Sequence, residues 1–180
     1  LQDEDTLQGL LEIIYRFNDM MSAISGLDQF TYQPGSGAQG IYTNACIIRA
    51  YHESKGQIGQ RDEVITTAFS HPADAATPHV AGFKVITLMP GENGYPDLDA
   101  LKAVVSERTA GFMVTNPEDT GLFNPHMGQM VKLVKDAGGL CAYDQANANG
   151  VFGITRTMDW WPRPLDNVFI FAPATIESAA

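Results

Sequence analysis

The stretch that decides the fold is residues 139–153, GLCAYDQANANGVFG. Leu140 to Tyr143 form a continuous apolar run, without the alternation of apolar and polar residues that marks a half-exposed strand. Glycines precede this short run and an asparagine-rich turn follows it, which predicts a strand buried on both faces. The strand ends at Asp144, so we expect a carboxylate at its carboxyl end.

On both sides of this stretch, strand-like and helix-like segments alternate along the chain. Four further strands are expected, over EVITTAF (63–69), KVITLMP (84–90), TAGFMVT (109–115) and NVFIFA (167–172). Helices are expected over residues 5–25, 38–55, 73–81, 98–107 and 126–138. Because the strands are apolar throughout, we predict an α/β fold of three αβα layers with a mostly parallel sheet. Residues 1–180 read as a single domain with a leading helix over residues 1–26.

The composition is that of a soluble globular domain with an acidic surface. The 180 residues are 44% hydrophobic and 18% charged, and the formal charge is −10. This charge disfavours nucleic acid and anionic membranes as partners, since both attract clustered Lys and Arg. No apolar run is long enough to span a bilayer, and the acidic start shows no secretion signal. We therefore expect a cytoplasmic protein in which Cys46 and Cys141 are reduced, with a disulfide as the less favoured alternative.

The segment GSGAQG at residues 35–40 precedes a predicted helix. A glycine-rich turn that enters a helix offers free backbone N–H groups and the positive end of the helix dipole, which together can bind a phosphate. Ser36 would add a hydroxyl donor. Glycine and serine are common at helix starts, so on this segment alone an ordinary turn is the favoured reading.

Polar side chains also follow three of the predicted strands. Asp144 lies where open α/β sheets bind ligands, and it could hold a protonated ring nitrogen or equally cap the following turn. His71 follows the first predicted strand and could stack on a flat ring, although a lone histidine is more often a surface or core residue. Thr115 and Asn116 could line the same pocket or simply end their strand. The histidines and cysteines show no spacing typical of a metal site, and we predict none.

Four long segments resemble one enzyme family. GLDQFTYQPGSGAQGIYTNACIIRAYHESKG (26–56) is similar to QPxSGAQGEYAGLxxIRAYHESRG, and SHPADAATPHVAGFKVITL (70–88) is similar to SAHGTNPASAxxAGFKVV. ENGYPDLDALKAVVSERTAGFMVTNPEDTGLF (92–123) resembles ENGxxDLxxLKxxVxxxTAxxMxTxPxTxGLFE, and GLCAYDQANANGVFG resembles GxxYYDGANLNAxxG. The family is the P-protein of the glycine cleavage system, glycine dehydrogenase (decarboxylating), and the resemblance is to its catalytic subunit or half.

This resemblance implies a fold like the large domain of fold-type-I transferases that use pyridoxal phosphate (PLP). In the family, PLP withdraws the electrons left when glycine loses CO2, and the aminomethyl group passes to the lipoyl arm of the H-protein. Asp144 would pair with the ring nitrogen of PLP, and His71 would stack on the ring. The other positions implied at the cofactor are Ser36, Gly37 and Ala38 around the phosphate and Thr115, Asn147 and Asn149 beside the ring.

The departures from the family pattern fall in the implied active site. No lysine occurs after Lys135, and Ala174 stands where the family has the lysine that anchors PLP. The family sequence H-G-T-N becomes His71-Pro72-Ala73-Asp74, and Ile41 replaces a glutamate. The sequence therefore predicts that the fold persists, that no residue of the chain is catalytic, and that PLP binds non-covalently and weakly or not at all.

Three readings follow from these departures. In the leading reading, the chain is a truncated and inactive P-protein-like domain. In the second, it is a non-catalytic interaction protein that forms a homo-oligomer, most simply a dimer, since truncation would uncover apolar surface. In the third, it is a glycine-decarboxylase subunit that another chain completes with a lysine, and its partners are the glycine cleavage proteins.

Overall fold

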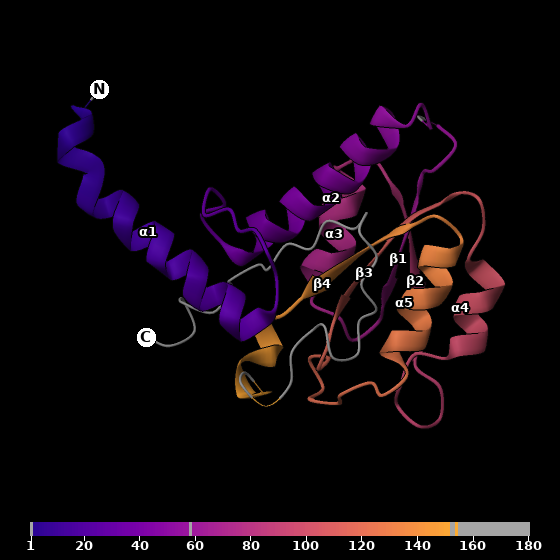
Figure 1. The fold of residues 1–180 in the computed structure, drawn as a ribbon. Helices are drawn as coiled ribbons and strands as arrows, with labels where there is room; N and C mark the ends of the chain where they lie inside the picture. Colours follow the sequence, from indigo (N-terminus) through magenta and orange to yellow (C-terminus); the bar gives the residue numbers. More distant parts are fainter. Residues whose placement is uncertain (1, 58, 152–153, 155–180) are drawn as a thin grey trace.

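The computed structural model describes residues 2–57, 59–151 and 154 (Figure 1). The predicted strand over residues 167–172 and the position of Ala174 lie outside these residues. Within them, four parallel strands form one sheet in the order β2-β1-β3-β4. The strands are β1 (Glu63–Thr67), β2 (Lys84–Leu88), β3 (Thr109–Thr115) and β4 (Leu140–Asp144).

Helices cover both faces of this sheet, as predicted (Figure 1). On one face, α2 (Gly37–Ser54) and α3 (Pro72–Val80) bury side chains such as Ile41 and Ile48 against β1, β3 and β4. On the other face, α4 (Leu98–Val104) and α5 (Met127–Asp136) pack in the same way through a second apolar cluster. Every residue of β3 and β4 is buried, which explains why these strands show no alternation of apolar and polar residues.

Side-chain caps fix the starts of two helices at the predicted places. The Ser36 hydroxyl accepts the N–H of Gln39 at the start of α2, and the Asp97 carboxylate accepts the N–H of Asp99 at the start of α4. The end of α4 was predicted three residues too late. The backbone is already extended at Val105, and the hydroxyl of Thr109 accepts the N–H of Ser106, so the chain turns there into β3.

Helix α2 runs antiparallel to the strands. Near its end, His52 Nε2 lies 2.8 Å from the carbonyl oxygen of Ala110, at the beginning of β3. Near its start, Ile41 belongs to the same apolar cluster as Ala142, two residues before β4 ends. The first turn of α2 therefore lies at the carboxyl edge of the sheet, where the strands end.

Helix α1 (Glu4–Ser25) projects from the rest of the molecule (Figure 1). It ends at Gly26, whose φ of 77° is in the left-handed region that favours glycine. Met21 and Leu27 form a small apolar cluster with Phe17 and Phe30 at the base of the helix. No described helix is both long enough and apolar enough to cross a membrane. Cys46 and Cys141 are both free thiols.

The close approach of α2 to the sheet depends on Gly111 in β3. A Cβ atom at this position would lie 3.0 Å from Ile48 Cδ1 and 3.2 Å from the carbonyl oxygen of Leu140. We expect Gly111→Ala to lower the free energy of unfolding by about 1–3 kcal/mol, because it overpacks this contact. Urea denaturation followed by circular dichroism measures the change.

Gly9→Ala is the matched control, because a Cβ at Gly9 in α1 meets nothing within 4 Å. This change should leave the stability unchanged or raise it by roughly 0.5–1 kcal/mol, since alanine favours a helix interior. A Gly111→Ala variant as stable as the Gly9→Ala variant would show that the contact between α2 and β3 can relax at no cost.

Candidate functional site

The carboxyl ends of β1, β3 and β4 bring three predicted site residues together. Thr115 and Asp144 are register partners at the ends of β3 and β4. His71 follows β1, and its backbone N–H donates to Thr115 Oγ1 at 2.9 Å. The chain leaves β1 toward β2 on one side and returns to β3 on the other, so this is the point at which the strand order reverses. Ligands of open α/β sheets bind at such points.

The first turn of α2 lies at the same edge and retains free donors. The hydroxyl oxygen of Ser36 accepts the Gln39 N–H at 3.3 Å, which leaves the hydroxyl proton available to a ligand. Within the described part of the chain, the backbone N–H groups of Gly37 and Ala38 have no acceptor. Such N–H groups, together with the helix dipole, favour an anion.

His71 caps α3 and presents its ring to solvent. Its Nδ1 accepts the backbone N–H of Ala73 at 3.1 Å, so in the neutral ring the proton lies on Nε2. Pro72 occupies the first turn of α3, where its fixed φ suits a helix start. The exposed ring is therefore held in one orientation and one tautomer, as stacking on a flat ligand requires.

Asp144 is 2% exposed and uses one of its two carboxylate oxygens locally. Its Oδ1 accepts the backbone N–H of Ala146 at 2.9 Å, whereas Oδ2 has no hydrogen-bond partner among the described residues. Burial raises the pKa of Asp144, and the hydrogen bond from the Ala146 N–H opposes that rise. The second oxygen remains able to accept a proton donor from a ligand.

Thr115 does not line the site but lies beneath it. The side chain is 1% exposed, and its hydroxyl accepts from His71 and donates to Asp74 Oδ2 at 2.8 Å. Its backbone N–H donates to Ser70 Oγ at 2.9 Å. With both roles of its hydroxyl filled, Thr115 supports His71 rather than contacting a ligand.

Asn147 is exposed and ties two loops together. Its Nδ2 donates to the carbonyl oxygen of Pro117 at 3.1 Å and to Asp119 Oδ1 at 2.9 Å. These bonds hold the short 3₁₀ helix over Ala146–Val151, which follows β4, against the loop after β3. The side chain of Asn149 lies outside the part of the chain that the structure describes.

Sequence reasoning missed two buried acids at this edge. Asp74 is 1% exposed, and burial raises its pKa well above the ordinary value, with Asp144 adding to the rise. Glu118 is also 1% exposed, and its Oε1 accepts the Thr67 hydroxyl at 2.7 Å while Oε2 has no partner among the described residues. The sequence signal was weak, because Asp74 lies in the first turn of α3 and Glu118 in the loop after β3, and acids at such positions are usually exposed.

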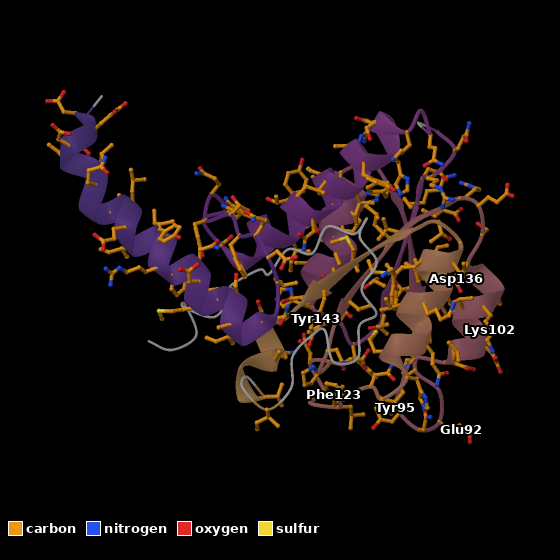
Figure 2. The ribbon with its side chains drawn as sticks, viewed as in Figure 1. Glu92, Tyr95, Lys102, Phe123, Asp136 and Tyr143 are labelled. Carbon is orange, nitrogen blue, oxygen red and sulfur yellow. The ribbon has the colours of Figure 1, made fainter. Side chains whose placement is uncertain are left out.

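Basic side chains gather at the opposite edge of the sheet. Arg108 and Lys84 pair with Asp62 before β1, and Arg61 donates to the carbonyl oxygens of Thr109 and Ala137. In Figure 2, Phe123, Tyr95 and Glu92 mark the loops at the carboxyl edge, and Asp136 lies at the far end of α5. Among the described residues, no group of three or more His, Cys, Asp or Glu side chains could hold a metal ion.

A separate open pocket of about 480 Å³ lies between the loop after β2 and the start of α5. Glu92, Asp97, His126 and Gln129 are among its lining residues. Neither Asp144 nor His71 lines this pocket, so it is distinct from the strand-end site.

The chain is homologous to one region of glycine dehydrogenase (decarboxylating) subunit 2. It is 45% identical over 158 residues to the probable subunit 2 of Pyrococcus abyssi, 43% over 159 residues to that of Staphylothermus marinus and 44% over 159 residues to that of Staphylococcus aureus. Each match covers 88% of this chain but only 30–32% of the relative, so the chain spans about a third of these proteins. No protein-family model matches the chain.

Solved structures share the fold. An aspartate aminotransferase mutant of Thermus thermophilus matches 71% of this chain and 33% of its own, with a TM-score of 0.56 and 18% identity. An aromatic aminotransferase of Pyrococcus horikoshii matches 76% of this chain and 36% of its own, with a TM-score of 0.57 and 14% identity. These matches and the parallel sheet confirm the predicted fold-type-I transferase architecture.

The buried acid Glu118 yields a prediction about stability and pH. Burial raises the pKa of Glu118 above its ordinary 4.5 in the folded protein. The folded state therefore holds this proton more tightly than the unfolded state, and stability falls as pH rises from about 4.5 through the raised value. We expect Glu118→Gln to be more stable than the natural chain at pH 7 and to lose this advantage as pH falls toward 4.

Thermal unfolding between pH 4 and pH 8 measures the difference. Glu107→Gln, which changes an exposed glutamate, is the control and should give a pH profile parallel to that of the natural chain. A Glu118→Gln profile that runs parallel to both would mean that Glu118 is as well solvated when folded as when unfolded.

Proposed function

We propose that this chain is the cofactor-facing region of a glycine dehydrogenase-type domain, that it binds PLP non-covalently, and that it does not decarboxylate glycine by itself. One observation carries the proposal. Asp144, a buried carboxylate with one oxygen that no described residue binds, ends β4 next to the strand-order reversal of the sheet and near the exposed His71. The identity of 43–46% with glycine dehydrogenase subunit 2 supports the substrate class.

The described residues fit the parts of PLP separately. The open oxygen of Asp144 suits the N–H of a protonated pyridine ring, and the ring of His71 offers a flat surface for stacking. The free N–H groups of Gly37 and Ala38, with the hydroxyl proton of Ser36, suit a phosphate. No lysine or arginine of the described residues forms part of this cradle, which supports weak binding.

Bound PLP would supply an electron sink for the bond that breaks in glycine. The chain's own residues supply binding and orientation. Asp144 would hold a proton on the ring nitrogen and His71 would cover one face of the ring, while the Thr115 hydroxyl accepts the backbone N–H of His71. Asn147 closes the loop after β3 over the end of β4.

The position of Ala174 supports the proposed lack of catalysis. By resemblance, this residue stands at the lysine that would anchor PLP and move protons, and no lysine follows Lys135. In the alternative reading, another subunit of a glycine cleavage assembly supplies the missing lysine amine, and this chain is then one part of an active enzyme. Glycine turnover by the chain mixed with such partners, and not by the chain alone, would favour that reading.

An oligomerisation role is the second candidate, and one observation favours it. Helix α1 carries large apolar side chains that are 38–69% exposed, among them Leu10, Leu11, Ile13, Tyr15 and Met20. Surface of this kind favours association. Analytical ultracentrifugation of the natural chain tests this candidate independently of any ligand, since a monomer at all concentrations would exclude it.

Binding of PLP should depend on Asp144. We expect Asp144→Asn to weaken PLP binding roughly 10- to 100-fold, because a hydrogen bond to a charged group is lost. Equilibrium dialysis, with PLP measured by its visible absorbance, gives the affinity. The control is Asp99→Asn, which changes a carboxylate that is 83% exposed and should bind PLP like the natural chain. If Asp144→Asn binds PLP as tightly as the natural chain, the ring nitrogen does not contact Asp144. If the natural chain shows no saturable binding, the proposed cofactor is refuted.

Restoring one lysine should not restore turnover. In Ala174→Lys, the altered His71-Pro72-Ala73-Asp74 turn and Ile41 remain. Misplacement by about 1 Å can cost roughly 100-fold in rate, so several altered positions should leave glycine decarboxylation undetectable. Release of CO2 from carboxyl-labelled glycine, in the presence of PLP and lipoylated H-protein, measures the activity. Full turnover by Ala174→Lys would show that the site is intact except for its lysine.

A further inference from the structure

We infer that Glu118, in the loop after β3, is a positioning residue for the turn that carries His71. Its side chain acts through two hydroxyl groups, those of Thr67 and Ser70, which connect it to the backbone N–H of Thr115. Thr115 in turn binds the backbone of His71. This role belongs to the chain alone, so it holds whether or not PLP is the ligand.

Two reciprocal hydrogen bonds join the turn after β1 to the end of β3. The Thr115 hydroxyl accepts the backbone N–H of His71 at 2.9 Å, and the Thr115 backbone N–H donates to Ser70 Oγ at 2.9 Å. The second bond depends on a side chain that can rotate, because Ser70 Oγ moves with the rotamer of Ser70. A neighbour that holds Ser70 Oγ in place therefore stabilises the whole pair.

Only one arrangement of the hydroxyl hydrogens gives each of them an acceptor. Thr67 Oγ1 lies 2.7 Å from Ser70 Oγ and 2.7 Å from Glu118 Oε1. If Thr67 donates to Glu118, then Ser70 donates to Thr67 and keeps a lone pair for the Thr115 N–H. In the reverse order, Ser70 accepts twice, and its own hydrogen has no acceptor among the described residues. The complete arrangement needs an acceptor at Glu118 Oε1, and it is the same whether or not Oε2 carries a proton.

Burial makes these bonds costly to lose. Thr67, Ser70 and Glu118 are all buried, so water does not readily replace a missing partner. The backbone of Glu118 is held separately from its side chain. Its N–H donates to the carbonyl oxygen of Leu122 at 3.0 Å, and its own carbonyl oxygen accepts the N–H of Gly121 at 2.8 Å. A change of the Glu118 side chain can therefore leave the loop closed while it removes the acceptor.

Hydrogen exchange at two backbone amides, followed by NMR on the chain without ligand, tests this role. The Thr115 amide reports the bond to Ser70, and the His71 amide reports the bond to Thr115. Thr67→Val cuts the connection at its middle with little change of shape, and Glu118→Ala removes its acceptor. We expect each change to lower the protection of both amides roughly three- to tenfold, because a buried hydrogen bond is weakened. Glu118→Gln keeps an oxygen that can accept from Thr67, so it should retain the protection within about twofold.

Two controls separate this effect from a general loss of stability. The amide of Met113, in the middle of β3, reports opening of the sheet, and the protection of the other two amides is expressed relative to it. Glu107→Ala changes an exposed glutamate and should leave all three amides as they are in the natural chain.

The double variant Thr67→Val/Glu118→Ala distinguishes one connected path from two separate contacts. If Glu118 acts through Thr67, the double variant loses no more protection than Thr67→Val alone, within about twofold, whereas independent losses would multiply. Multiplied losses, unchanged protection in Thr67→Val, or a loss at Thr115 that His71 does not share would each overturn the inference. If Glu118→Ala does not fold, Thr67→Val and Glu118→Gln still decide, since a loss of protection in Glu118→Gln as large as that in Thr67→Val would also overturn it.

Discussion

The single hydrogen of the Thr115 hydroxyl group is the constraint on which the arrangement of the site depends. This hydrogen links Thr115, at the end of β3, to Asp74 in α3. The hydroxyl oxygen of Thr115 accepts the backbone N–H of His71, which follows β1. Asp144 lies beside it as the register partner in β4. The position of the His71 backbone relative to Asp144 therefore depends on one buried side chain and on the pairing of two strands.

The sheet explains why these groups meet. Parallel strands all end at one edge, and α2 runs back antiparallel to them, so its first turn reaches the same edge. Acids then accumulate beside helix starts, and Arg61, Arg108 and Lys84 lie at the other edge. This separation of charge favours the pairing of Asp144 with a ring cation, and in the proposed site it leaves a phosphate to the backbone N–H groups and the Ser36 hydroxyl at the start of α2.

Most of the described fold could be predicted from sequence because its signals are local. Continuous apolar runs predicted the buried strands, and the segments between them predicted the helices that cover the sheet. The buried position of Thr115 and the roles of Asp74 and Glu118 could not be predicted. The burial of these residues depends on which strands are neighbours in the sheet. Their hydrogen-bond partners depend on strand register. Neither can be read from the residues next to them in the sequence. The sequence signal for Asp144 was stronger, because it ends a strand buried along its whole length.

The projecting helix α1 has a consequence for how the molecule opens. Its described anchor is the small cluster of Met21, Leu27, Phe17 and Phe30 at its base, and most of its large apolar side chains are already in water. Melting its outer turns exposes little further apolar surface, so that step adds little to the heat capacity change of unfolding. A calorimetric transition should therefore report the sheet and its four covering helices, and α1 should fray at temperatures where they are still intact.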